Sequence, residues 1–184
     1  MIRCLKSSSW PLKAVLFSLF LSAPLPSFAE SASAQVGFSP EGTAQVLVLN
    51  VIKSAQSSIH MIGYNFTARD IAEALISAKK RGVNVQVVLD YKENQNRYSQ
   101  AVMNLLVNAG IDVRTSDYYK IQHDKVIIVD ARHVETGSFN FTSSAEKSNS
   151  ENALVMWNAP QLANEYLQHW QSRWDKGTPY HSSY

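Results

Sequence analysis

The chain has 184 residues, which corresponds to one domain of ordinary size, and its 45% apolar and 17% charged residues exclude a disordered or collagen-like chain. The formal net charge is +2, but three of the 17 Lys and Arg residues lie within residues 1–29, so the remainder carries 14 basic and 15 acidic residues. This excludes a surface that is positively charged overall and binds nucleic acid or anionic lipid through that charge. Any affinity for phosphate must come from a local cluster of basic residues.

Residues 1–29 have the pattern of a secretory signal peptide. Arg3 and Lys6 give a basic start, an apolar run follows, and Ser27-Phe28-Ala29 fits the small-x-small cleavage pattern. The longest uncharged stretch has 16 residues and two prolines, whereas a membrane-spanning helix needs about 20 apolar residues. We therefore expect cleavage, a periplasmic or secreted protein and no stable membrane anchor; retention of the segment is the alternative. The only cysteine, Cys4, lies in this segment, so a cleaved chain has neither a disulfide nor a thiolate metal ligand.

Residues 30–40 are small and polar and predict a flexible lead-in, after which helical and strand patterns alternate. Val46, Leu49 and Ile52 recur at the spacing of a helix face, and residues 83–89 are almost continuously apolar, as in a strand covered on both faces. In this half we expect helices over residues 42–55, 67–82 and 99–109, and strands over residues 58–64, 83–89 and 111–114.

In the second half of the chain, helices and strands no longer alternate. Only residues 130–133 separate the expected strands 125–129 and 134–137, which is too short for a helical crossover and predicts an antiparallel hairpin. A strand over residues 151–157 and a helix from Pro160 to about residue 176 follow, and residues 178–184 form a polar tail. We therefore expect a single α/β domain over residues 41–177, with a mixed, mostly parallel sheet flanked by helices on both faces.

The residues whose side chains could take part in catalysis are concentrated around residues 123–140. His123 and Lys125 are two positions apart on an expected strand, so their side chains project from the same face. A neutral imidazole nitrogen can attack phosphorus, and a neighbouring ammonium can hold the non-bridging oxygens of a phosphate ester. Asp130 has the opposite parity, and we expect it to anchor the hairpin by accepting hydrogen bonds and not to act as a base.

Six residues after Asp130, Gly137 permits close backbone approach, and Ser138 and Asn140 add two small polar side chains. With these positions the sequence resembles the phospholipase D superfamily, whose motif H-x-K-x4-D-x6-G-S-x-N it matches at every fixed position. The matching residues are His123, Lys125, Asp130, Gly137, Ser138 and Asn140. It looks most like the small exported bacterial endonucleases with one motif per chain. That resemblance implies a metal-independent phosphodiesterase without a cofactor, acting on DNA, in which two chains share one active site.

Counting the reactive groups also favours a homodimer. Two-step displacement at a phosphodiester needs a nucleophile on one side of phosphorus and an acid on the other, and the chain has only one suitable His and Lys pair. His123 would form a phosphohistidine while its copy protonates the leaving oxygen. Lys125 and Asn140 would hold the phosphate, assisted by Ser138. The family pattern implies that Glu151 is the acid that fixes the tautomer of His123.

The substrate stays open at this stage. The family likeness and Tyr118-Tyr119-Lys120, which leads into the site strand, favour a sequence-nonspecific nuclease for DNA, with RNA as a further candidate substrate. A phospholipase D-type hydrolase of lipid headgroups is the alternative enzyme, and a nucleic-acid-binding module without activity is the alternative of another class. His60 and His169 fit packed positions better than ligand positions, and no His or carboxylate spacing predicts a metal site.

Overall fold

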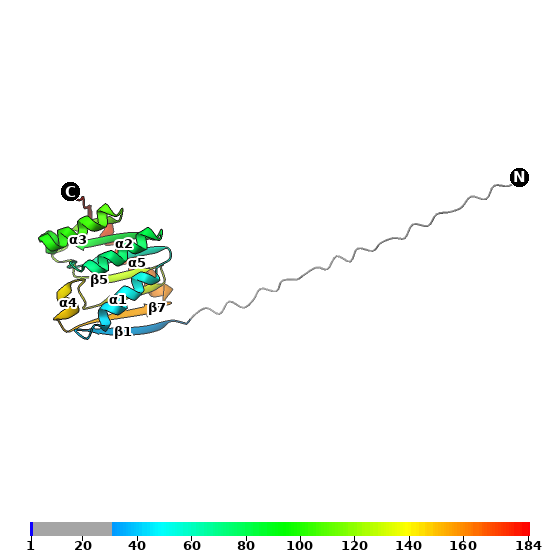
Figure 1. Ribbon diagram of the computed structural model, residues 1–184, viewed down its shortest axis with the longest axis horizontal. Helices are drawn as coiled ribbons and strands as arrows, with labels where there is room; N and C mark the ends of the chain where they lie inside the picture. Colours follow the sequence, from blue (N-terminus) through cyan, green and yellow to red (C-terminus); the bar gives the residue numbers. More distant parts are fainter. Residues whose placement is uncertain (2–30) are drawn as a thin grey trace.

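The computed structural model describes residue 1 and residues 31–184 (Figure 1), so the predicted signal peptide lies almost wholly outside the described residues. The described chain forms one eight-stranded sheet in the order β1-β7-β6-β5-β2-β3-β4-β8. The strands are β1 (Ser33–Ser39), β2 (Ser58–Gly63), β3 (Asn84–Asp90), β4 (Asp112–Ser116), β5 (Lys125–Val129), β6 (His133–Gly137), β7 (Glu151–Trp157) and β8 (Thr178–Pro179). The helices are α1 (Thr43–Ser54), α2 (Arg69–Lys80), the short 3₁₀ helix η1 (Glu93–Gln95), α3 (Arg97–Asn108), α4 (Ser143–Lys147) and α5 (Pro160–Trp174).

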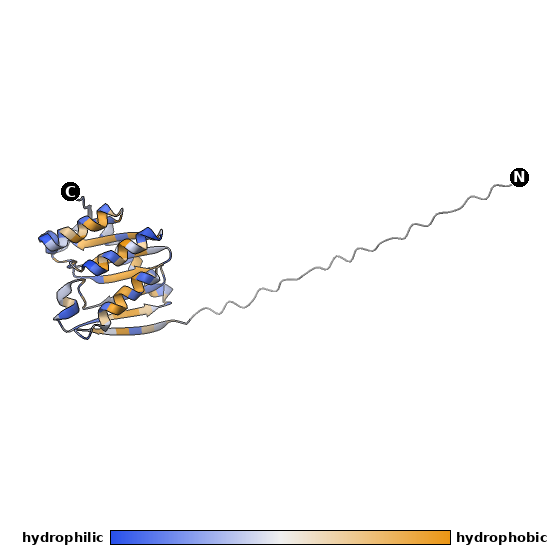
Figure 2. Ribbon diagram, viewed as in Figure 1, coloured by the Kyte–Doolittle hydropathy of each residue, from blue (hydrophilic) through white to orange (hydrophobic). Residues whose placement is uncertain are grey.

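The sheet lies between two apolar cores. The larger core joins the sheet to α1, α2 and α3, and the smaller one joins its other face to α5. Figure 2 shows the apolar central strands and the alternation of apolar and polar residues around the helices. Strand β5 contributes to both cores, with Ile127 and Val129 in the larger and Val126 and Ile128 in the smaller. Burial on both faces explains why this strand is a continuous apolar run without alternation.

The expected mixed sheet with helices on both faces is confirmed, but the expectation that it is mostly parallel was wrong. Only the pairings β2–β3 and β3–β4 are parallel, and the other five pairings are antiparallel. The parallel pairs arise where α2 and α3 serve as crossover helices. Strands β5, β6 and β7 follow one another without such a crossover, and β1 and β8 close the two edges in antiparallel pairings.

The expectation of a flexible lead-in was wrong, because residues 33–39 are a strand, and the first two residues of the expected polar tail, Thr178 and Pro179, also pair with the sheet. Residues 33–39 form β1, which pairs along the full length of β7. Gly37 of this strand lies against the start of α1, where an added Cβ would stand 2.5 Å from the backbone oxygen of Thr43. At the other edge β8 pairs with β4, and the hydroxyl of Tyr180 donates a 2.9 Å hydrogen bond to Oδ1 of Asn104. Residues 33–39 thus cover the edge of β7, and Thr178 and Pro179 cover part of the edge of β4.

Asp130 anchors the far end of β5. Its Oδ1 accepts hydrogen bonds from the backbone N–H of Ser57 and of Ser58, each at 2.8 Å, and Oδ2 accepts one from the backbone N–H of Gln56 at 2.9 Å. Burial alone would raise the pKa of Asp130, but these hydrogen bonds outweigh it and the pKa is lowered. The residue has φ of 54°, a left-handed conformation that Asp tolerates better than most residues.

We expect Asp130→Ala to lower the free energy of unfolding by about 3 kcal/mol, because three backbone amides lose a charged acceptor. Asp130→Asn keeps an oxygen acceptor and should cost less. Because the folded-state pKa lies below the ordinary value of 3.8, the carboxylate's contribution is complete above pH 3.8 and disappears as the pH falls through the folded-state pKa. Urea unfolding of the wild type and of Asp130→Asn between pH 7 and pH 2 measures this. A stability difference that grows as the solution is acidified would contradict the assignment.

Candidate active site

The sheet brings the separate parts of the predicted site to one edge. Gly63 at the end of β2 pairs with Lys125 at the start of β5, and Gly137 at the end of β6 pairs with Ala153 near the start of β7. A cavity of about 400 Å³ lies at this edge. The residues that line it are His123, Lys125, Gly137, Ser138, Asn140 and Glu151. Of the predicted site residues only Asp130 is absent from the cavity, since it lies at the opposite end of β5.

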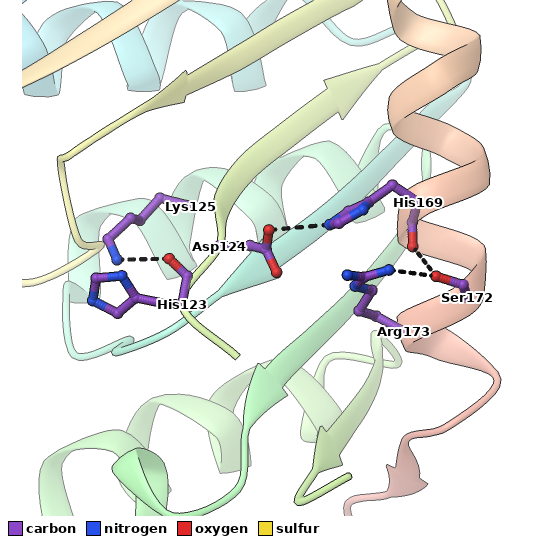
Figure 3. A network of polar contacts seen from close by, with 6 residues as sticks. All are labelled: His123, Asp124, Lys125, His169, Ser172 and Arg173. Carbon is purple, nitrogen blue, oxygen red and sulfur yellow. Dashed lines mark hydrogen bonds and ion pairs between the residues drawn. The ribbon is translucent and has the colours of Figure 1, made fainter. Parts of the chain in front are cut away.

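His123 and Lys125 lie on the same side of the chain, as their spacing predicts (Figure 3). His123 is exposed just before β5, whereas Lys125 is only 6% exposed and its Nζ donates a 2.8 Å hydrogen bond to the backbone oxygen of His123. Burial lowers the pKa of Lys125, although the carboxylates of Asp124 and Glu151 oppose the shift. The cavity therefore combines an accessible imidazole with a fixed cation.

The other polar residues of the cavity are held by β7. An added Cβ on Gly137 would stand 2.2 Å from the backbone oxygen of Asn152, so glycine is required where β6 approaches β7. Ser138 donates its backbone N–H to the same oxygen at 3.1 Å, and its Oγ accepts the backbone N–H of Asn152 at 3.0 Å. The hydroxyl hydrogen of Ser138 thus stays able to donate to a ligand. Within residues 31–184, Oδ1 of Asn140 is buried without a hydrogen-bond partner, and the amide NH2 group of the same side chain is the part that can donate to a phosphate oxygen.

Glu151 lies in the cavity as the first residue of β7 and is half-buried. Its Oε1 accepts a 3.0 Å hydrogen bond from Nδ2 of Asn149. Among the described residues no hydrogen bond joins it to His123, so the orienting role implied by the family pattern stays a prediction.

Tyr64 is a site residue that the sequence interpretation missed. Its ring meets that of His123 edge to face at a centroid distance of 4.7 Å, and Nζ of Lys125 lies 5.2 Å from the ring centroid. A signal was present, because residues 64–67 (Tyr-Asn-Phe-Thr) echo residues 139–142 (Phe-Asn-Phe-Thr). The two segments lie side by side, joined by a parallel bridge between Phe66 and Phe141.

On the side of β5 that faces away from the cavity, a carboxylate contacts a histidine of α5. Asp124 points away from the cavity, and its Oδ1 lies 3.0 Å from Nε2 of His169 on α5 (Figure 3). The expectation that His169 is a packing residue missed this contact, because it depends on how α5 crosses the sheet. His60 packs edge to face against Trp170 at 4.4 Å, and burial lowers its pKa. In the described part of the chain, no group of three or more His, Cys, Asp or Glu residues is arranged to hold a metal ion.

Comparisons with known proteins place this site in a family. The family model described as "Cardiolipin synthase, PLD-like domain" matches residues 48–174. The phospholipase D of Rickettsia conorii is 39% identical over 136 residues, which cover 74% of this chain and 66% of that protein. The mitochondrial cardiolipin hydrolase of Danio rerio is 32% identical over 133 residues, which cover 72% of this chain and 57% of that protein. The chain thus spans two thirds or less of the length of these relatives.

Two solved structures resemble the whole fold. Nuc from Salmonella typhimurium, a phospholipase D family member, is 58% identical with a TM-score of 0.82, covering 83% of this chain and 100% of that chain. NucT from Helicobacter pylori is 26% identical with a TM-score of 0.74, covering 82% of this chain and 100% of that chain. The family match spans more than half of the chain and includes the residues that line the cavity, so the protein belongs to the phospholipase D superfamily.

Proposed function

We propose that this protein is a metal-independent phosphodiesterase that cleaves DNA without sequence preference, with RNA as a second candidate substrate. The observation that carries the proposal is the single cavity in which an exposed His123 stands beside the buried ammonium of Lys125, with Ser138 and Asn140 on the wall. These groups suit a phosphodiester, and they include no element that reads base edges. The 58% identity with Nuc supports a nuclease over other activities of the superfamily.

The proposed reaction has two displacement steps at phosphorus. The neutral ring nitrogen of His123 attacks phosphorus, the bond from phosphorus to the leaving sugar oxygen breaks, and that oxygen takes a proton from a second imidazole. The second imidazole then removes a proton from water, which attacks phosphorus and breaks the phosphorus–nitrogen bond. Lys125 and Asn140 hold the non-bridging oxygens in both steps, with Ser138 donating its hydroxyl hydrogen. Glu151 holds the tautomer of His123 in which the attacking nitrogen carries no proton.

The second imidazole is proposed to come from a second copy of the chain. The cavity contains only His123, whereas the two steps need two imidazoles in opposite protonation states. A twofold dimer that faces two such cavities supplies both. Quenching the reaction on a labelled oligonucleotide and mapping the label by mass spectrometry tests the intermediate, and sedimentation tests the dimer. A fully active monomer, or label on a residue other than His123, would contradict this scheme.

The substrate is tested by parallel digestions of plasmid, single-stranded DNA, RNA, phosphatidylcholine vesicles and cardiolipin vesicles by the mature protein in excess EDTA. We expect DNA to be cleaved at the same rate with and without EDTA, because Lys125 supplies the positive charge at the phosphate. Loss of activity in EDTA that added Mg²⁺ restores would contradict a metal-independent reaction. The names of the curated relatives, phospholipase D and mitochondrial cardiolipin hydrolase, favour a lipid diester as the alternative, and hydrolysis of lipid alone would establish it.

We also propose that the protein is exported and cleaved after Ala29. The basic start, the short apolar run and the small-x-small sequence before residue 30 support this. The described residues contain no helix that is long and apolar enough to cross a bilayer. Mass measurement of the protein recovered from a periplasmic fraction tests the proposal, since a chain retaining residues 1–29 in the membrane would overturn it.

A further inference from the structure

A group of aromatic and basic residues outside the cavity has no part in the mechanism above. Tyr118, Tyr119, Arg173 and Lys176, here called the tyrosine patch, bring the loop before β5 together with the end of α5. Tyr118 is 65% exposed, and its ring meets that of Tyr119 edge to face at 5.0 Å. Nζ of Lys176 lies 4.3 Å from the centroid of Tyr118 and donates a 3.1 Å hydrogen bond to the hydroxyl of Tyr119. The guanidinium carbon of Arg173 lies 4.9 Å from the centroid of Tyr119.

The patch is held in a fixed position relative to the cavity. The loop of residues 117–124 leaves β4 and enters β5, and it is tied down midway where the buried backbone N–H of Gln122 donates a 2.8 Å hydrogen bond to Oδ2 of Asp90. At its end, Asp124 contacts His169 on the same helix that carries Arg173 (Figure 3). Strands β2 and β3 lie between β4 and β5, so three strand spacings, about 14 Å, separate the ends of the loop across the sheet.

We propose that the tyrosine patch is an accessory binding site for single-stranded nucleic acid, on the loop that leads from β4 into the site strand β5. The inference rests on the proposed function, since it names how that substrate is held. An unpaired base stacks on the exposed ring of Tyr118, and Lys176 and Arg173 neutralise phosphates beside it. Nη1 of Arg173 donates a 2.7 Å hydrogen bond to Oγ of Ser172, and a guanidinium has five N–H donors in all.

The chemistry of the patch favours a nucleic acid strand over a lipid surface. Binding at a bilayer interface depends on a broad apolar face, and next to the patch the loop exposes only one aliphatic side chain, Ile121. A stacked base needs only one open ring, which Tyr118 provides. The net charge of −1 outside residues 1–29 means that such a local site is needed to retain a polyanion.

The test measures binding of fluorescent oligo(dT) to full-length mature protein carrying His123→Ala, so that cleavage does not interfere. We expect Tyr118→Leu to weaken binding of a 12-mer about tenfold, and Tyr118→Trp to preserve it. Lys176→Gln should reduce the slope of log affinity against log salt by about 0.7. Tyr184→Leu and Lys53→Gln remove an exposed ring and an exposed cation elsewhere on the surface and should leave binding unchanged.

The possible results distinguish a failure of the patch inference from a failure of the proposed nuclease function. If Tyr118→Leu binds the 12-mer as tightly as Tyr184→Leu does, the patch is not a binding site, whatever the cleavage activity of the wild type. If Tyr118→Leu instead weakens binding to anionic vesicles and not to DNA, the patch is a membrane contact and the inference is overturned. A wild-type protein that binds DNA through Tyr118 and Lys176 without cleaving any DNA would retain the patch and contradict the nuclease. Thermal unfolding of each variant checks that the loop stays folded.

Discussion

His123→Ala is expected to lower kcat for DNA cleavage by at least about 10⁴-fold, the largest effect of any single substitution in the chain. In the proposed reaction, the substitution removes the atom that attacks phosphorus and, in the proposed dimer, also the acid on the opposite side. The residual rate comes from substrate held by Lys125 and Asn140 without a nucleophile. The fold should be unchanged, because the ring of His123 is exposed and its one close aromatic contact is the edge of Tyr64. We expect the free energy of unfolding to change by less than about 1 kcal/mol.

The matched control is His181→Ala, which removes another exposed histidine far along the chain and should retain full activity. Single-turnover kinetics on an oligonucleotide give the rate, and circular dichroism and thermal unfolding verify the fold. A His123→Ala protein that keeps more than a few per cent of the wild-type rate would show that the cavity is not the catalytic centre.

The second largest effect is expected for Lys125→Met, which should lower kcat/KM by about 10³-fold. Lys125 is the one basic residue among those that line the cavity, and its ammonium is fixed by the backbone oxygen of His123. Methionine keeps much of the length of the side chain and its apolar stem but removes the charge at the phosphate. Lys125→Arg should recover only part of the rate, since a planar guanidinium does not fit a position that holds a compact ammonium at 6% exposure.

The alkaline side of the pH profile distinguishes this role from a structural one. In the proposed mechanism the charged form of Lys125 is the active one. Because burial lowers its pKa, activity should begin to fall at a pH below the ordinary pKa of 10.5. Arginine stays charged throughout that range. The residual activity of Lys125→Arg should therefore decline at higher pH than that of the wild type. If activity falls over the same alkaline pH range in both proteins, the fall is caused by a group other than Lys125.

The parts of the fold that follow from local sequence were predicted well. Strands β5 and β7 have the expected boundaries, and in β5 an apolar run that ends at a short turn leaves little freedom. The grouping of His123 with Lys125 follows from the two-residue period of an extended chain, and the later motif residues join them because β6 pairs next to β5.

The parts that were missed depend on tertiary contacts. Strand β1 has no strong strand pattern of its own, and its pairing with β7 determines its structure. The proximity of Tyr64 to His123, and the contact between Asp124 and His169, join residues that are 59 and 45 positions apart. No periodicity within either segment specifies such a contact.

The burial of β5 on both faces has a consequence for how the protein should lose the proposed activity on heating. Because the strand is enclosed by two cores, we expect its amide hydrogens to exchange mainly when the whole domain opens. Lys125 is the first residue of that strand and His123 stands two residues before it. The reactive pair therefore sits at one end of the most persistent part of the structure, and we expect inactivation to coincide with the melting of the domain instead of preceding it.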